Sequence, residues 1–200
     1  MAITTYLFDI DEALIDPKTS ERLYTPLLAM IKKKLILTDE RLERRAQSLG
    51  LLQNERGQYN PAQLCKALGV LPLYYEELAK HIQPSALVQD NIETVFRRLK
   101  LEGKHIGIVS NTSKQTIQHH LDAYKLTKYT VFAFGADDGM CLQSNALYWR
   151  QLAHTQALEP AQCIVVGDDE QELALARNVG FATIPLKDTK NLKKITERLA

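Results

Sequence analysis

The sequence predicts an α/β protein with a doubly wound parallel sheet and a small inserted all-helical segment. From residue 87 onward, short apolar runs alternate with amphipathic helical segments, which is typical of parallel strands joined by helices. Residues 17–86 differ, because their apolar residues recur at helical spacing and no strand-like run occurs. In addition, three of the apolar runs end abruptly in polar residues, as strands do where a parallel sheet carries a site.

The first strand is expected at residues 6–8, a buried apolar run that ends in acids. The inserted segment is expected to hold four helices. The first contains Leu27, Leu28, Ile31 and Leu35 at helical spacing, and the second is capped by Thr38 and ends near Gly50. The third and fourth are expected at 61–68 and 72–82.

Strands and helices then alternate to the end of the sequence. Apolar residues between 88 and 99 mark one face of a helix that is expected to stop at Gly103. Thr112 with Gln115 matches a capping box that opens the next helix. Three further helices are expected at 144–158, 169–179 and 189–199. The remaining strands are expected at 106–109, 131–134, 163–166 and 182–185.

Composition and charge narrow the classes of function. The chain is 45% hydrophobic, enough for a core, and its formal net charge of +1 gives no reason to expect a nucleic-acid or membrane partner. Three widely spaced cysteines argue against a disulfide framework and favour a reducing compartment. No signal-peptide pattern or membrane-length apolar run is found. We therefore expect a cytoplasmic protein, monomeric or homodimeric.

Polar residues follow three of the expected strands, whose carboxyl ends should meet at one edge of the sheet. A carboxylate there can attack phosphorus, and a second carboxylate one residue away can serve as acid and then as base. Such an acidic cluster needs a cation, and oxygen ligands favour magnesium. The residues concerned are Asp9 and Asp11 after the first strand, Ser110 and Asn111 after the second, and Asp168, Asp169 and Glu172 after the fourth.

These motifs resemble those of the haloacid dehalogenase superfamily of hydrolases, over essentially the whole chain. The first motif of the family, Asp-x-Asp-x-Thr or Val, is matched by residues 9–13, and the second, an apolar strand ending in Ser or Thr, by residues 106–111. The fourth, an apolar strand followed by Gly-Asp and another acid, is matched by residues 165–169 with Glu172. The sequence looks closest to the cap-bearing nucleotidase-like and phosphoglycolate-phosphatase-like members.

The resemblance implies a Rossmann-like core at residues 1–16 and 87–200 and a helical cap at 17–86 that closes over the substrate. It also implies hydrolysis of a small phosphorylated metabolite through an aspartyl-phosphate, with Mg²⁺ as the cofactor. Dehalogenation is less favoured than phosphate hydrolysis, because the dehalogenases of the superfamily usually lack the second carboxylate. The implied roles are nucleophile for Asp9, acid and base for Asp11, phosphate ligand for Ser110 with Asn111, metal ligand for Asp9, Asp11 and Asp168, and supporting acid for Asp169 or Glu172.

The third family motif, a lysine, is missing. The spacing usual in the family, counted back from Asp168, reaches Gln143, which we expect to contact phosphate in its place. Glutamine donates a hydrogen bond but carries no charge, and loss of one such preorganised contact costs about 2.7–4 kcal/mol of transition-state stabilisation, about 10²–10³ in rate. Ala13 also replaces the Thr or Val of the first motif, and Glu12 adds an anion there.

Two interpretations of the missing lysine stay open at the level of sequence. In the first, another cation substitutes for it, and the candidates are Lys18, Arg22, Lys114 and Arg150. In the second, catalysis has decayed and the protein has a binding or regulatory role.

Overall fold

The computed structural model describes residues 2–10, 14–15, 18–53, 57–82, 91–186 and 195, excepting the side chains of 18–21. The chain divides into two compact units, one made of Met1–Asp16 and Gln83–Ala200 and the other of Pro17–Ile82. The expected boundary between residues 86 and 87 lies outside the described residues.

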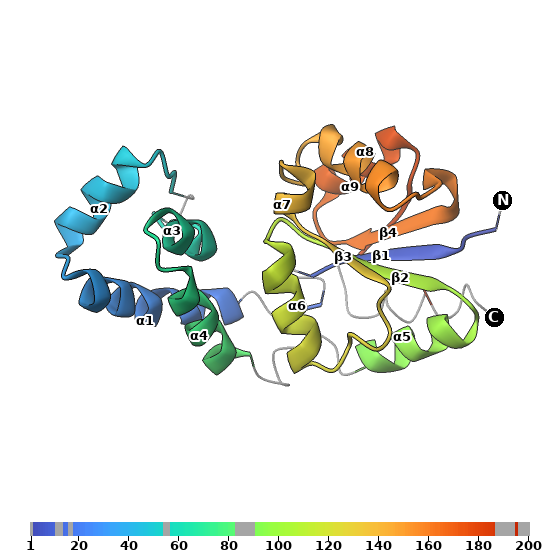
Figure 1. Cartoon of the computed structure of the whole chain (residues 1–200). Helices are drawn as coiled ribbons and strands as arrows, with labels where there is room; N and C mark the ends of the chain where they lie inside the picture. The colour runs from blue at the N-terminus through green and yellow to red at the C-terminus, as the bar shows by residue number, and fades with distance from the viewer. Residues whose placement is uncertain are drawn as a thin grey trace. The chain divides into compact units, whose positions relative to one another are not determined.

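A parallel sheet forms the centre of the first unit (Figure 1). Its strands run in the order β3-β2-β1-β4-β5, so β1 is central and the strand order reverses beside it, which is the switch point of a doubly wound sheet. The predicted fold class is therefore confirmed. The strands are β1 Thr5–Asp9, β2 His105–Val109, β3 Phe132–Phe134, β4 Cys163–Gly167 and β5 Ala182–Pro185.

Helices cover both faces of this sheet (Figure 1). On one face lie α5, Ile92–Leu101, and α6, Lys114–Ala123; on the other lie α8, Ala146–Thr155, and α9, Glu170–Val179. Because side chains of a strand alternate between faces, Leu7 belongs to the buried cluster that includes residues of α8 and α9. Phe8 instead contacts Phe96 of α5, with ring centroids 4.8 Å apart.

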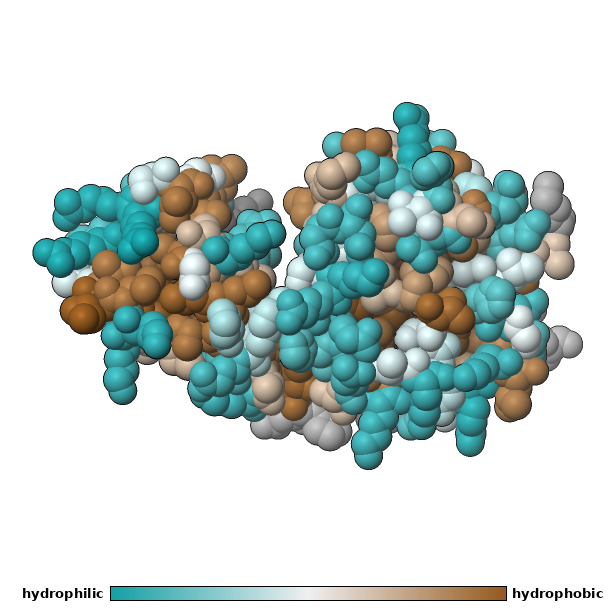
Figure 2. All heavy atoms as spheres, in the orientation of Figure 1, coloured by the Kyte–Doolittle hydropathy of each residue, from teal (hydrophilic) through white to brown (hydrophobic). Residues whose placement is uncertain are grey.

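The second unit is helical in its described part and holds the four helices expected from the sequence. They are α1 Lys18–Leu35, α2 Asp39–Ser48, α3 Pro61–Ala67 and α4 Leu71–His81, packed around a core that includes Leu27, Ile31, Leu42, Leu64 and Leu78. Thr38 caps α2 as predicted, since its hydroxyl accepts a hydrogen bond from the Arg41 amide. Figure 2 shows apolar surface between the polar side chains of this unit.

Two sequence-based assignments in the first unit need correction. The helix expected to be capped by Thr112 is capped by Ser113, whose Oγ accepts from the Thr116 amide at 3.2 Å. The main chain of Thr112 bonds elsewhere, to Ser110 Oγ and to the Ala136 amide. The short helix α7, Ala136–Gly139, was not expected, because four residues are too few for a periodic pattern. The last expected helix, 189–199, lies outside the described residues except for Ile195.

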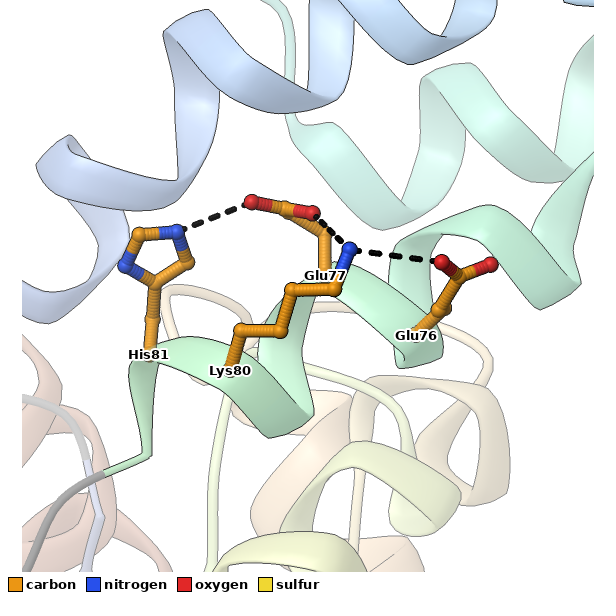
Figure 3. Close-up of polar contacts among 4 residues, drawn as sticks. All are labelled: Glu76, Glu77, Lys80 and His81. Carbon is orange, nitrogen blue, oxygen red and sulfur yellow. Dashed lines mark hydrogen bonds and ion pairs between the residues drawn. The ribbon is translucent and has the colours of Figure 1, made fainter.

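A buried carboxylate of α4 is compensated within its own helix (Figure 3). Glu77 is 5% exposed, and its two oxygens lie 3.0 Å from Lys80 Nζ and 3.0 Å from His81 Nε2. Burial alone would raise the pKa of Glu77, but the bonds from Lys80 and His81 lower it below its ordinary value. The carboxylate is thus held in its charged form at the carboxyl end of α4, where cations also suit the helix dipole.

Ile36, between α1 and α2, has a left-handed backbone with φ of 52° and is 87% exposed. A β-branched residue in this region is strained by about 1–2 kcal/mol. We expect Ile36→Gly to raise the free energy of unfolding by about 1 kcal/mol, since the relief of backbone strain exceeds the entropy cost of glycine. Urea unfolding measures it, with Ile36→Ala as the control that keeps the Cβ; equal midpoints for the two variants would contradict the expectation.

A buried histidine in α6 predicts a loss of stability in acid. His120 is 7% exposed and stacks on Tyr124, and its Nδ1 has no hydrogen-bond partner among the described residues. Burial, with a smaller effect of His119, lowers the pKa of His120 from 6.5 to about 4. Between these two values the unfolded chain binds a proton that the folded chain excludes, so stability falls as the pH drops from 6.5 towards 4.

The expected loss over this range is about 3 kcal/mol. In His120→Phe, which keeps a ring beside Tyr124, the loss between pH 6.5 and pH 4 should shrink by that amount in urea unfolding series. His154→Gln, at an exposed position of α8, is the control and should keep the wild-type profile. A His120→Phe profile that follows the wild type would show that this histidine does not set the acid sensitivity.

Candidate functional site

The ends of β1, β2 and β4 bring three of the expected site residues to one edge of the sheet. Asp9 is the last residue of the central strand and lies opposite Val109 of β2, while Phe8 lies opposite Val166 of β4. Ser110 therefore follows on one side of Asp9 and Asp168 on the other. Asp9 and Asp168 are partly exposed, and Ser110 is buried.

Asp11, Glu12 and Ala13 lie outside the described residues. The expected roles of Asp11, as acid and base and as a metal ligand, therefore rest on the sequence alone. The described part of this segment is Asp9 with Ile10, whose amide donates to Asp9 Oδ1 at 2.9 Å.

Gln143 is buried in the position where the family lysine was expected. It is 1% exposed, and the amide orientation that satisfies its neighbours has Nε2 donating to Glu172 Oε2 at 2.6 Å. In the same orientation its Oε1 accepts from the Ser110 amide at 3.2 Å. The neutral side chain therefore connects the residue after β2 with the first turn of α9.

Asn111 makes a second neutral connection to the same carboxylate. Its Nδ2 donates to Glu172 Oε1 at 2.8 Å, and its Oδ1 accepts from the Gln143 amide at 2.7 Å. The carbonyl of Gln143 in turn accepts from the indole of Trp149 at 2.9 Å. Both oxygens of Glu172 thus accept hydrogen bonds from side-chain amides, and each hydrogen-bonding group of Gln143 is used.

Asp169 is the N-cap of α9. Its Oδ1 accepts from the amides of Gln171 and Glu172, at 2.7 and 3.1 Å. This cap fixes the first turn of the helix directly after Asp168 and so orients Glu172 towards Asn111 and Gln143.

Three of the four cations named from the sequence as substitutes for the lysine have described side chains, and all three are exposed. Lys114 Nζ lies 3.7 Å from Asp138 Oδ1 and is about half exposed. Arg22 and Arg150 are exposed, and the side chain of Lys18 lies outside the described residues. Among these described candidates, Lys114 is the one with an ion pair, and that pair is formed with an acid of α7.

A cavity of about 10 Å³ is lined by Asp9, Gln143, Gly167, Asp169 and Glu172, among others, which is room for about one water molecule. Among the described residues, no group of three or more His, Cys, Asp or Glu side chains is arranged to hold a metal ion. Of the expected set of Asp9, Asp11 and Asp168, Asp11 lies outside the described residues. The donors present at this edge are carboxylate and amide oxygens, the kind that Mg²⁺ prefers.

Sequence reasoning missed Tyr148, which is completely buried in α8. Its hydroxyl donates to the Phe134 carbonyl at 2.8 Å and accepts from the Ser110 amide at 3.1 Å. The available signal was general, namely that a buried tyrosine needs a hydrogen-bond partner. Nothing in the spacing of Tyr148 pointed to Ser110.

Solved structures share this fold at low sequence identity. YfnB from Bacillus subtilis, described as a HAD-hydrolase bound to magnesium, is 17% identical with a TM-score of 0.66, covering 100% of this chain and 99% of that one. A β-phosphoglucomutase from Clostridium difficile is 17% identical with a TM-score of 0.62, covering 96% and 88%. An L-2-haloacid dehalogenase is 14% identical with a TM-score of 0.63, covering 100% of each chain.

No curated protein matches the chain by sequence. In the described residues, no helix combines the length and apolar character needed to cross a membrane. The sequence profile of the haloacid dehalogenase-like hydrolases matches residues 6–185. This stretch covers β1 from Tyr6 onward, all the other strands of the sheet and the motifs at its carboxyl edge, so the chain belongs to the haloacid dehalogenase-like hydrolase family.

Proposed function

We propose that the protein is a Mg²⁺-dependent hydrolase of a small phosphorylated metabolite and works through an aspartyl-phosphate on Asp9. The observation that carries this proposal is the place of Asp9 at the end of the central strand, between the residues that follow β2 and β4. Among the structural neighbours, the β-phosphoglucomutase adds support for phosphoryl chemistry and the magnesium-bound hydrolase adds support for Mg²⁺.

In this proposal an oxygen of Asp9 attacks phosphorus, and the ester P–O bond breaks. The leaving alkoxide takes a proton from Asp11. Water then attacks the phosphorus of the acyl phosphate and gives a proton to the Asp11 carboxylate, while the bond from phosphorus to Asp9 breaks and inorganic phosphate leaves. Ser110 would donate to a phosphoryl oxygen during both steps.

Asp9, Asp168 and the main-chain carbonyl of Asp11 would hold the magnesium ion, and their oxygen donors suit it better than they suit zinc. When bound, the ion would offset the negative charge shared by the carboxylates and the phosphoryl group. The helical unit Pro17–Ile82 would serve as the cap of the enzyme.

A binding or regulatory role is the second candidate, and the neutral Gln143 favours it. This side chain is buried and holds Glu172 and Ser110 by hydrogen bonds alone. The site therefore has no lysine charge at that position, which lowers the expected rate of phosphoryl transfer.

Turnover assays separate these candidates. The purified protein is incubated with a panel of phosphomonoesters, with Mg²⁺ or with a chelator, and released inorganic phosphate is measured. Phosphate release that requires Mg²⁺ is the expected result. A folded protein that releases no phosphate from any ester contradicts the proposal, and halide release from a 2-haloacid in a parallel assay would assign it to the dehalogenases instead.

A further inference from the structure

The hydroxyl of Tyr148 contacts both main-chain groups of Ser110. Its Oη accepts from the Ser110 amide at 3.1 Å and lies 3.3 Å from the Ser110 carbonyl oxygen. The same oxygen donates to the carbonyl of Phe134, the last residue of β3, at 2.8 Å. One buried hydroxyl thus ties the residue that follows β2 to the end of β3.

The ring that carries this hydroxyl is held by packing. Tyr148 contacts Phe134 and Trp149 edge-on, with ring centroids 5.2 and 5.3 Å apart. A Cβ added to Gly139 would lie 2.7 Å from Tyr148 Cδ2, a distance that real Cβ atoms do not show, so the ring fills all the space beside α7. The hydroxyl therefore has one position, set by α7, α8 and β3.

The hydroxyl is also held in its neutral form. Burial raises the pKa of Tyr148 far above its ordinary value, and the charges of Asp9 and Glu172 raise it further. The phenol therefore stays a hydrogen-bond donor at any pH at which the protein works.

We propose that Tyr148 is a positioning residue, which fixes the main chain of Ser110 and with it the hydroxyl that meets the phosphoryl group. This inference rests on the proposed function, because it takes Ser110 as the phosphate ligand. Tyr148 itself touches no substrate. It acts through the peptide groups on both sides of Ser110, at the point where β2 ends beside Asp9.

Two variants test the inference from opposite sides. Tyr148→Phe removes Oη and keeps the ring, whereas Gly139→Ala keeps Oη and displaces the ring. Both are expected to lower kcat/KM about tenfold, the effect of losing one buried hydrogen bond, and to weaken inhibition by inorganic phosphate to a similar degree. Tyr124→Phe is the matched control, since it removes a buried tyrosine hydroxyl from the same unit, one without a partner among the described residues.

Phosphate inhibition separates positioning from a purely structural role. If Tyr148 served stability alone, Tyr148→Phe would lower the urea midpoint but would keep the wild-type kcat/KM and phosphate inhibition well below the unfolding transition. That result overturns the inference and leaves the proposed function standing.

If the wild type hydrolyses no ester, the inference is tested by measuring the binding of inorganic phosphate with calorimetry. The proposed hydrolysis then fails, and Tyr148 is judged by binding alone. Weaker phosphate binding by Tyr148→Phe than by Tyr124→Phe supports the positioning role. Equal binding by the two variants overturns it, as does a wild type that binds no phosphate.

Discussion

Replacing Asp9 with asparagine is expected to abolish phosphate release. The change removes the charge and the nucleophilic oxygen at the end of β1 while keeping the size of the side chain and one oxygen that can accept from the Ile10 amide, as Asp9 Oδ1 does now. Loss of a covalent nucleophile typically costs about 10⁶-fold in kcat. The measurement is phosphate release from the best ester of the panel at saturating Mg²⁺.

Asp122→Asn is the control for this experiment. Asp122 is an exposed acid of α6 that accepts hydrogen bonds from Thr127 and Gln118, so the same chemical change is made away from the strand ends. It should keep wild-type kinetics. If Asp9→Asn retained a rate within tenfold of wild type, Asp9 would not be the nucleophile and the mechanism would have to be abandoned.

Replacing Gln143 with lysine is expected to raise kcat/KM by about 10²–10³. Gln143 Nε2 lies 2.6 Å from Glu172 Oε2, so a lysine side chain from this position reaches the same carboxylate. Its ammonium group would bring a positive charge to a cavity lined by Asp9, Asp169 and Glu172. The Ser110 amide would keep the acceptors Tyr148 Oη and the Phe134 carbonyl.

Gln143→Met separates charge from volume in this test. Methionine has a similar length but neither donates to Glu172 nor accepts from Ser110, so its kcat/KM should fall below that of wild type. A lysine variant that is active but no faster than an active wild type would show that another cation already serves the site. Lysine and methionine variants that are both inactive, with the fold intact, would favour the binding or regulatory role.

The sheet and the approximate position of the site follow from local patterns. Apolar runs such as residues 163–166 can be recognised one at a time, and parallel strands place the residues after them at a common edge. For this reason the sequence places Asp9, Ser110 and Asp168 at the ends of strands, and the structure shows that these strands, β1, β2 and β4, are adjacent in the sheet. Their chemical roles stay predictions.

The hydrogen bonds inside the site depend on distant parts of the chain and have no local signal. The sequence predicts a phosphate contact for Gln143, which stays a prediction, but it does not predict the bonds of its amide to Glu172 and Ser110. That arrangement needs α9 to begin directly after β4, with Asp169 as its cap. The sequence also cannot tell whether Thr112 or Ser113 caps α6, because adjacent hydroxyl residues offer the same capping signal. Hydrogen bonds that the main chain of Thr112 makes elsewhere leave Ser113 as the cap.

Mass spectrometry of the protein quenched in acid during turnover tests the central claim most directly. In the presence of Mg²⁺ and the best ester, the peptide that contains Asp9 is expected to carry one phosphoryl group, and Asp9→Asn is expected to carry none. Turnover with an unmodified Asp9 peptide, or with the phosphoryl group on another residue, would contradict the aspartyl-phosphate mechanism.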